Sequence, residues 1–365
     1  MDNQLDVFIF CGEASGDLLG AELIEHLLCV NPHLKIGGVT GHKMKSYPVE
    51  SLLSVEDFQV MGFIDVFKSL PRLISQFFIV RNHILSTHPK YVILVDYPGF
   101  NLRLAKSLKK NGCQSTIIQY VCPSVWAWKK NRLQTMKKYI DHVWTLFSFE
   151  SFYLESYKIP HTFIGHPLEK KIPDATKKGA ENLLLIFPGS RKKELERNFI
   201  IQLEALLPFI DDYRIGISYL NQEDMDWMRS QIKTPSQNIF FFNEESKYKL
   251  MQEATLALAT SGTITLELAL FQVPTVVNYK LSAFDSFLAK YIFNINLPYY
   301  CIVNFVCLKK IFPEFYSHKL KSEDLYHEIA RLLSNKELLN QISMSTKQLR
   351  NGIEKKINFF PIIQF

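Results

Sequence analysis

Short apolar runs alternate with segments of helical periodicity along the first half of the chain. The runs at 6–11, 91–95 and 115–121 have the length and composition of buried strands. Apolar residues recur at helical spacing over 18–28 and 102–110, which follow the first two runs. A strand, a loop and a helix in regular order predict a parallel sheet with crossover helices.

The same order starts again in the second half. The stretch 170–182 is polar and contains proline and glycine, which indicates a hinge or linker after a strand at 161–164. A helix predicted at 193–207 follows the first strand of the new series. Parallel sheets bind ligands at the carboxyl ends of their strands, so we expect a site in a cleft between the halves. Strands of the second series are predicted at 183–187, 214–218, 238–242, 254–259 and 274–277.

Composition narrows the class of protein. The chain has 365 residues, 47% apolar and 21% charged, and a net charge of +6 is too small to indicate nucleic acid. Six cysteines without a C-x-x-C pair favour free thiols in a reducing compartment. The N-terminus lacks the basic region of a signal peptide, and the uncharged run between Lys290 and Lys309 is broken by Pro298. We therefore expect a soluble or peripheral cytoplasmic protein without metal or cofactor.

A glycine-rich loop joins the first strand to the first helix. It reads Gly-Glu-Ala-Ser-Gly-Asp over 12–17, and the dinucleotide fingerprint G-x-G-x-x-G is absent. Ser15 and Gly16 would leave backbone N–H groups free for a ligand, and Glu13 would place a carboxylate at the mouth of the sheet. The structural alternative is a tight turn in which Ser15 or Asp17 caps the helix.

Asp96 follows the predicted strand 91–95 and begins the segment Asp-Tyr-Pro-Gly-Phe-Asn, which ends at Asn101. A carboxylate at the carboxyl end of a strand can accept a proton from a hydroxyl nucleophile. The alternative is a turn that begins at Asp96. A second segment, Pro-Ser-Val-Trp-Ala-Trp at 123–128, precedes several basic residues. Ser124 and Trp126 there suggest contact with phosphate or lipid headgroups, and the alternative is a solvated basic helix face.

Two loops in the second half suggest a phosphate and ribose site. Arg191 ends the turn Pro-Gly-Ser-Arg after strand 183–187, and its planar guanidinium suits phosphate. The turn after strand 254–259 contains small residues and opens a helix near Thr263, which is typical of an anion-binding nest. Glu267, one helical turn later, could accept hydrogen bonds from a ribose diol or serve only as a helix-dipole partner. The residues of this turn are Ser261, Gly262 and Thr263.

The segment 69–85 is amphipathic and predicts a helix with Ser69 as cap and Pro71 near its first position. Packing in the core is the favoured interpretation. The alternative is an interfacial membrane patch, helped by Lys129, Lys130 and Arg132. That patch would consist of Phe77, Phe78, Ile79 and Val80 beside Arg72 and Arg81.

Taken together, seven segments over roughly residues 5–330 resemble the lipid-A-disaccharide synthases. That family has the GT-B fold, which implies two Rossmann-like domains facing a central cleft. The resemblance implies an acceptor- and lipid-binding domain at 1–168, a UDP-sugar-binding domain at 169–345 and a divergent tail at 346–365. The segments are GEASGD (12–17), VMGF (60–63), VDYPGFN (95–101), YVCPSVWAWK (120–129), FIGHPL (163–168), FPGSRKKE (187–194) and TSGTITLELAL (260–270).

The resemblance also implies an activity. The family transfers 2,3-diacylglucosamine from UDP to 2,3-diacylglucosamine 1-phosphate (lipid X), with inversion and without a metal. The products are UDP and the β-1,6-linked disaccharide 1-phosphate of lipid A, a part of the lipopolysaccharide of Gram-negative bacteria. The enzyme would work as a peripheral protein at the cytoplasmic face of the inner membrane. A homodimer is one possible oligomeric state.

Site residues carry over position by position. Asp96 matches the aspartate taken as the base, and Arg191 matches the arginine expected at the UDP phosphates. Asn304 matches the asparagine of the family's Leu-Pro-Asn segment, whereas Gly99 stands where the family often has a second acid. The rival interpretations are another GT-B enzyme, such as a UDP-sugar 2-epimerase, and a non-enzymatic peripheral membrane protein. The donor-binding turn is matched by Ser261, Gly262, Thr263 and Glu267.

Overall fold

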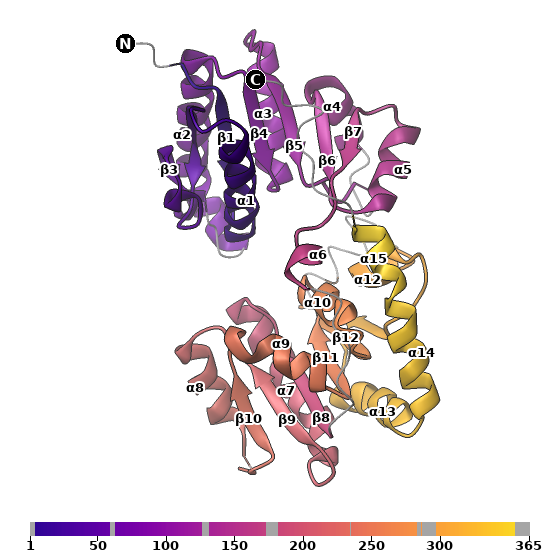
Figure 1. Ribbon diagram of the computed structural model, residues 1–365. Coiled ribbons are helices and arrows are strands. Elements are labelled where there is room, and N and C mark those ends of the chain that lie inside the picture. Colours follow the sequence, from indigo (N-terminus) through magenta and orange to yellow (C-terminus); the bar gives the residue numbers. More distant parts are fainter. Residues whose placement is uncertain are drawn as a thin grey trace. The chain divides into compact units, whose positions relative to one another are not determined.

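The computed structural model divides at Pro167 and Leu168 into two compact units, which are described separately. Each unit is α/β and contains one parallel sheet (Figure 1), as the alternation of strands and helices predicts. The residues described are 4–58, 63–125, 131–172, 182–233, 235–282, 286 and 297–354.

The first unit has a seven-stranded sheet with the order β3-β2-β1-β4-β5-β6-β7. Every neighbouring pair is parallel. Its order reverses between β1 and β4, and ligands bind at such a switch point in open α/β sheets. The strands are β1 (Val7–Cys11), β2 (Ile36–Thr40), β3 (Val49–Ser54), β4 (Tyr91–Val95), β5 (Thr116–Tyr120), β6 (His142–Thr145) and β7 (His161–Phe163).

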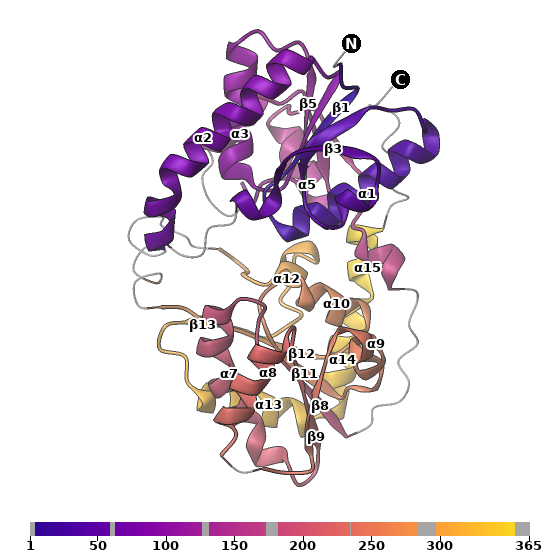
Figure 2. The ribbon, with the colours of Figure 1, turned by 90° about the vertical axis from the view of Figure 1, so that its left-hand side faces the viewer.

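Helices cover both faces of this sheet. Figure 2 shows α2 and α3 together on one side and α1 on the other. The core between the sheet and α2 and α3 includes Phe10, Leu94, Val80 and Leu104, all fully buried. The helices are α1 (Ala14–Val30), α2 (Phe63–Thr87), α3 (Pro98–Lys110), α4 (Asn131–Tyr139) and α5 (Ser148–Ser156).

The second unit has a six-stranded parallel sheet with the order β10-β9-β8-β11-β12-β13. Its switch point lies between β8 and β11. The strands are β8 (Leu183–Phe187), β9 (Arg214–Ser218), β10 (Ile239–Phe242), β11 (Leu256–Thr260), β12 (Thr275–Lys280) and β13 (Glu314–Ser317). The helices are α6 (Leu168–Lys171), α7 (Lys192–Leu206), α8 (Gln222–Gln231), α9 (Glu244–Glu253), α10 (Ile264–Leu270), α12 (Ile302–Val306), α13 (Ser322–Leu333), α14 (Lys336–Thr346) and α15 (Gln348–Ile353).

The apolar pattern did not predict four strands, which are β2, β3, β6 and β13. Strand β2 contains two glycines, and a Cβ on Gly38 would lie 2.2 Å from the Ile9 carbonyl oxygen. Glycine here permits close pairing with β1 although its low strand propensity hides the strand. Strands β3 and β13 are sheet edges, which need less apolar surface than central strands.

The predicted start of the amphipathic helix was wrong. Helix α2 begins at Phe63, so Pro71 lies inside the helix and not at its first position. The polar segment 170–182 begins within α6, and most of it lies outside the described residues, as do 60–62. The C-terminal stretch 348–353 forms α15, which buries Leu349 and Ile353.

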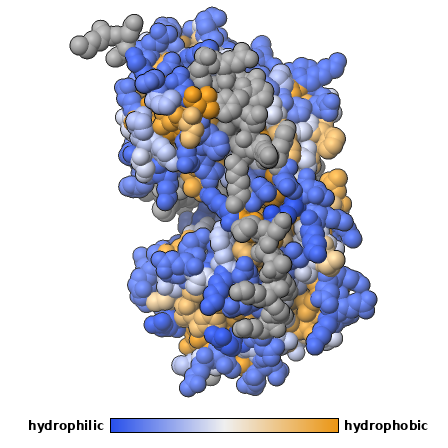
Figure 3. All heavy atoms as spheres, viewed as in Figure 1, coloured by the Kyte–Doolittle hydropathy of each residue, from blue (hydrophilic) through white to orange (hydrophobic). Residues whose placement is uncertain are grey.

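The face seen in Figure 3 is mainly hydrophilic, with smaller hydrophobic areas between the polar ones. Among the helices formed by the described residues, none combines the length and the apolar character needed to cross a bilayer.

Candidate active site

Two carboxylates meet at the carboxyl edge of the first sheet. Strands β1 and β4 are neighbours, with Cys11 opposite Val95. Glu13 follows β1 by two residues and Asp96 follows β4 directly. Register therefore brings together two acids that are more than 80 positions apart in the sequence, and both line one cavity.

A tyrosine ring packs the two loops against each other. A Cβ on Gly12 would lie 2.6 Å from the Tyr97 ring, so only glycine leaves room for it. The Tyr97 hydroxyl donates to the Phe58 carbonyl oxygen at 3.2 Å. Asp96 and Tyr97 both have a φ of 46°, a region that L-residues rarely adopt. Such strain persists when surrounding contacts fix the backbone, and it concentrates at functional sites.

Buried amides hold the backbone of Asp96. The side chain of Asn101 donates to the Asp96 carbonyl oxygen, and Gln119 Nε2 donates to the same oxygen at 3.2 Å. Both amides are fully buried. These hydrogen bonds to the carbonyl oxygen fix the backbone of Asp96, and Asp96 lines the cavity. Asn101 thus acts in this structure as a support for Asp96.

The Asp96 carboxyl is partly desolvated. Burial raises its pKa above the ordinary value of 3.8, although a hydrogen bond from the Tyr97 backbone opposes the rise. A base with a raised pKa accepts a proton more readily than an ordinary aspartate and still ionises at neutral pH when the rise is moderate.

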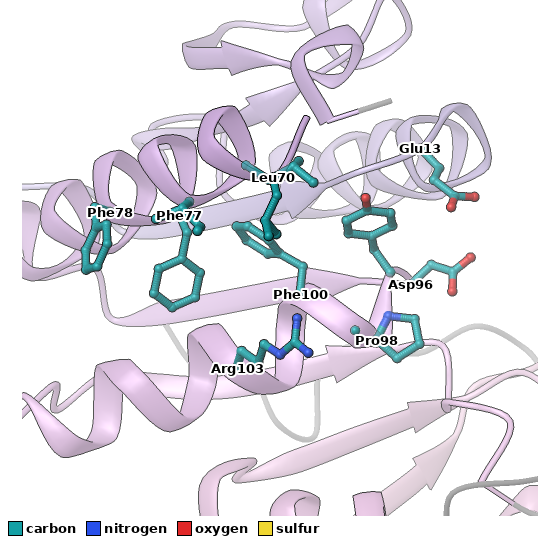
Figure 4. Close-up of a pocket in the computed structure, with 12 residues that line it drawn as sticks. Glu13, Leu70, Phe77, Phe78, Asp96, Pro98, Phe100 and Arg103 are labelled. Carbon is teal, nitrogen blue, oxygen red and sulfur yellow. The ribbon is translucent and has the colours of Figure 1, made fainter. Parts of the chain in front are cut away.

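The cavity has a volume of about 650 Å³ and is mainly apolar. Figure 4 shows Glu13 and Asp96 at one end, the rings of Phe77 and Phe78 at the other, and Arg103 along one side. A polar end with acids and a long apolar end would suit an amphipathic ligand. The remaining lining residues are Leu70, Leu73, Ile74, Tyr97, Pro98, Gly99 and Phe100.

Asp17 stabilises the loop after β2 rather than the start of its own helix. Its buried carboxylate accepts backbone N–H groups from Gly41 at 2.9 Å, Lys43 at 2.8 Å and Met44 at 3.1 Å. Ser15 is exposed and Gly16 is buried within α1. The helix has no side-chain cap, so the alternative in which Ser15 or Asp17 caps the helix was wrong.

We expect Asp17→Ala to lower the free energy of unfolding by about 3 kcal/mol or more, because three backbone N–H groups, two of them in buried hydrogen bonds, lose a charged acceptor. Urea unfolding measures this. Ser15→Ala, a neighbouring change on the exposed side, should stay within about 0.5 kcal/mol of the parent. Equal stability of the two variants would show that the loop does not depend on Asp17.

The aromatic and basic segment is only partly described. Ser124 is exposed and Val125 is fully buried, whereas Trp126, Lys129 and Lys130 lie outside the described residues. Arg132, at the start of α4, has its pKa lowered by burial and by the nearby charge of Arg103. The two guanidinium groups are therefore near enough for their charges to interact, and Arg103 lines the cavity.

The second unit has its own pocket, of about 260 Å³, at the carboxyl ends of β8 to β11. Ser261, Gly262, Thr263 and Glu267, all predicted from the sequence, line it together. The Ser261 N–H donates to the Asn278 carbonyl at 3.2 Å, so this donor of the expected anion nest is already in use. A Cβ on Gly262 would meet nothing within 4 Å, which leaves the turn open to a ligand.

Glu267 is buried and ion-paired. Its Oε2 lies 2.6 Å from Lys247 Nζ, and their side chains are 11% and 9% exposed. The sequence reasoning did not single out Lys247, which also lies 2.5 Å from Glu244 Oε1. Burial lowers the pKa of Lys247, but the two carboxylates outweigh this and raise it.

Arg191 is exposed beside this pocket and does not line it. Its Nη1 lies 3.1 Å from Glu194 Oε1, and the Tyr279 hydroxyl donates to the same oxygen at 3.2 Å. Glu194, Gly189 and Ser190 do line the pocket. Arg191 therefore follows directly in sequence on Ser190, which lines the pocket. Its guanidinium pairs with the Glu194 carboxylate, and a phosphate could take the place of that carboxylate.

Asn304 is fully buried in α12, and its side chain forms hydrogen bonds with backbone groups of a following loop. Its Oδ1 accepts from the N–H groups of Ile311 and Phe312, both at 2.8 Å, and its Nδ2 donates to the Phe312 carbonyl at 2.9 Å. These bonds fix the loop 307–312.

The two sheets, each with a pocket at its carboxyl edge, define the class as GT-B. Solved structures share this fold. A putative UDP-N-acetylglucosamine 2-epimerase from Listeria monocytogenes has a TM-score of 0.60 at 13% identity, covering 97% of this chain and 93% of that one. The calicheamicin glycosyltransferase CalG4 has a TM-score of 0.58 at 12% identity, covering 95% and 94%. At such identity the likeness concerns the fold alone.

The particular family follows from the sequence. A family model described as Lipid-A-disaccharide synthetase matches residues 7–359, and the chain belongs to that family. A lipid-A-disaccharide synthase from Chlamydia pneumoniae is 35% identical over 93% of this chain, and one from Wigglesworthia glossinidia brevipalpis is 33% identical over 96%. The chain spans 58% of the chlamydial relative's length and 92% of the other.

Proposed function

We propose that the chain is an inverting, metal-independent glycosyltransferase that makes the lipid A disaccharide. It transfers 2,3-diacylglucosamine from its UDP donor to 2,3-diacylglucosamine 1-phosphate and releases UDP. The observation that carries the proposal is the cavity of the first unit, where Asp96 and Glu13 stand at one end of an apolar chamber. An acceptor that carries both a reactive hydroxyl and acyl chains fits such a chamber.

The acceptor is placed by its chemistry. Its 6-hydroxyl lies at Asp96, its acyl chains lie along Phe77 and Phe78, and Arg103 supplies positive charge toward its phosphate (Figure 4). A UDP-sugar 2-epimerase has no need for an apolar chamber of this size. The donor nucleotide lies in the second unit, with Glu267 at the ribose and Arg191 at the diphosphate.

The reaction balances as a single displacement. The acceptor 6-oxygen attacks the anomeric carbon, the bond from that carbon to the UDP oxygen breaks, and UDP leaves with the electron pair. Asp96 takes the hydroxyl proton as the new bond forms. Arg191 and the part of the turn formed by Gly262 and Thr263 stabilise the charge that develops on the diphosphate. Asn304 contributes by fixing the loop 307–312.

One assay tests the whole proposal. The full chain is incubated with UDP-diacylglucosamine, with diacylglucosamine 1-phosphate, or with both. We expect release of UDP and formation of the disaccharide only when both are present. Release of UDP from the donor alone, with a free hexosamine product, would identify a different enzyme of the same fold.

We further propose that the protein works as a peripheral protein at the cytoplasmic face of the inner membrane. Leu70, Ile74 and Phe78 follow each other at four-residue spacing on α2 and are 45–48% exposed. All three also line the cavity, so the apolar surface continues into it. Arg81 lies 4.7 Å from the centre of the Phe78 ring and adds a cation beside the surface.

The structure changes the membrane surface suggested by the sequence. Val80 is fully buried in the core and cannot contribute. Phe77 is only partly exposed and packs against Phe100, with ring centres 5.5 Å apart. Phe78 and Ile79 remain exposed, and Ile74 takes the place of Phe77.

We expect Ile74→Ser with Phe78→Ser to weaken binding to anionic phospholipid vesicles about tenfold or more at high salt, where the apolar part of binding dominates. Vesicle cosedimentation over a salt series measures this. Val30→Ser, a similarly exposed apolar change on α1, should bind as the parent does. If the double variant folds and binds unchanged, the membrane surface lies elsewhere.

A further inference from the structure

Lys247 lies outside every segment that carries the family resemblance, yet it is the cation among the described residues that line the second pocket. It sits in the first turn of α9, and only 9% of its side chain is exposed. A lysine is rarely buried unless it is paired. The carboxylates that pair with Lys247 therefore indicate what this lysine does in the pocket.

The two partners of Lys247 differ in their access to water. The Glu244 side chain is 67% exposed, whereas that of Glu267 is 11% exposed. Water can solvate Glu244 without help, but the buried Glu267 carboxylate needs a compensating charge to stay ionised. Lys247 therefore matters chiefly to Glu267.

The contact also orients the carboxylate. Lys247 Nζ lies 2.6 Å from Glu267 Oε2, and both residues line the pocket. The Lys247 ammonium is itself held over the Tyr248 ring, 4.8 Å from its centre. The Tyr248 ring in turn packs on Phe271, with centres 5.2 Å apart. The lysine is thus fixed by rings as well as by charge.

Four titratable groups on two helices, α9 and α6, interact with Glu267. Lys247 and Glu244 face it from α9, Lys171 acts from α6, and the Tyr248 hydroxyl lies near enough to feel its charge. The pKa of Glu267 is raised on balance, because burial outweighs Lys247, the main group that opposes the rise. Removal of Lys247 would leave burial and Glu244 pushing the pKa of Glu267 upward, with Lys171 as the remaining cation.

We propose that Lys247 is a positioning residue for donor recognition, which keeps Glu267 ionised and holds its carboxylate in place for the 2′- and 3′-hydroxyls of a ribonucleoside diphosphate. The inference rests on the proposed function, in which Glu267 contacts the ribose. A carboxylate accepts two hydroxyl protons, but a protonated carboxyl accepts poorly and donates one. Lys247 thereby sets both the preference for ribose over deoxyribose and the pH range of donor binding.

The test compares UDP with 2′-deoxy-UDP, by calorimetry from pH 5.5 to 8.5. The parent should prefer UDP throughout. Lys247→Met should lose about tenfold or more in UDP affinity at the acid end and recover part of it at the alkaline end, as Glu267 ionises. Its affinity for 2′-deoxy-UDP should change little. Lys247→Arg should restore both the preference for UDP and the pH dependence of the parent.

The matched control is Lys249→Met, an exposed lysine two residues later on the same helix, which should bind both nucleotides as the parent does. If Lys247→Met does not fold, the double variant Lys247→Met/Glu267→Gln removes both charges. It should then bind UDP as weakly as Glu267→Gln alone and no more weakly.

Each other outcome overturns the inference in a recognisable way. Equal loss of UDP and 2′-deoxy-UDP at every pH would make Lys247 a phosphate ligand. Unchanged binding in Lys247→Met would leave it without a role in donor recognition. A parent protein that binds neither nucleotide would remove the donor pocket of the proposed function itself, and with it this inference.

Discussion

Asp96→Asn should lower turnover about 10²- to 10⁴-fold while UDP binding stays within about twofold of the parent. Asparagine keeps the size of the side chain but cannot accept the hydroxyl proton, and a general base typically contributes a factor of this size. The nucleotide pocket belongs to the other unit and does not include Asp96. Steady-state kinetics and calorimetry with UDP measure the two effects separately.

Glu13 and Gly99 provide the controls. Glu13→Gln should reduce turnover less than Asp96→Asn, because Glu13 lines the cavity beside Asp96 but is not the proposed base. A Cβ on Gly99 would meet nothing within 4 Å, so an acid fits there. We expect Asp96→Asn/Gly99→Asp to remain as inactive as Asp96→Asn. Recovery in this double variant, or near-normal turnover in Asp96→Asn, would move the base to another position.

The pH dependence of the parent follows from the same carboxyl. Asp96 acts only when ionised, and burial raises its pKa above that of an ordinary aspartate. The activity should therefore be present at neutral pH and fall as pH drops through this raised pKa. The acid limb of kcat/KM should lie higher than an exposed aspartate would place it. That limb should be absent from the residual activity of Asp96→Asn.

Burial on both faces gives a strand a clear apolar signal, although β2, which is buried throughout but contains two glycines, was missed. Strands β1, β4, β8 and β11 are buried at every position, so apolar runs mark them. Edge strands differ from one another: β3, partly exposed along its length, was missed, whereas β7 and β10 were predicted. The start of α2 was missed because Pro71 imitates a first helical position, and local sequence does not show that the helix is already formed.

The residues of the candidate site likewise divide into those that the sequence predicts and those that it does not. Acids and glycines at strand ends are visible in sequence, because strand ends are predictable from apolar runs. Lys247 and Arg103 were not found, since each sits on a helix and faces a pocket only after the strands have paired. The pair Glu244 and Lys247, three residues apart, was the available signal, but its spacing equally suits a solvated helix face. Contacts of Asp17 with residues 41–44 depend on tertiary packing and have no local signature.

Glu267→Ala should weaken UDP binding about 10- to 100-fold, because it removes a charged acceptor of the ribose hydroxyls. The parent should bind a 2′-deoxyuridine donor more weakly than the ribose form. This difference should nearly vanish in Glu267→Ala, since the carboxylate that reads the hydroxyl is gone. Competition calorimetry with the two nucleotides gives all four affinities. The same loss on deoxygenation in both proteins would refute the ribose assignment.

Arg191→Ala should also weaken UDP binding, but for a different reason. The guanidinium, 74% exposed and paired with Glu194, would exchange that acid for the diphosphate. The affinity for UDP should fall more than the affinity for uridine, because uridine has no phosphate that Arg191 could contact. The preference for ribose over deoxyribose should remain. Lys193→Ala removes an exposed cation from the same helical turn and is the matched control. If it weakens UDP as much as Arg191→Ala does, the effect is the general field of the helix start, and the assignment of Arg191 fails.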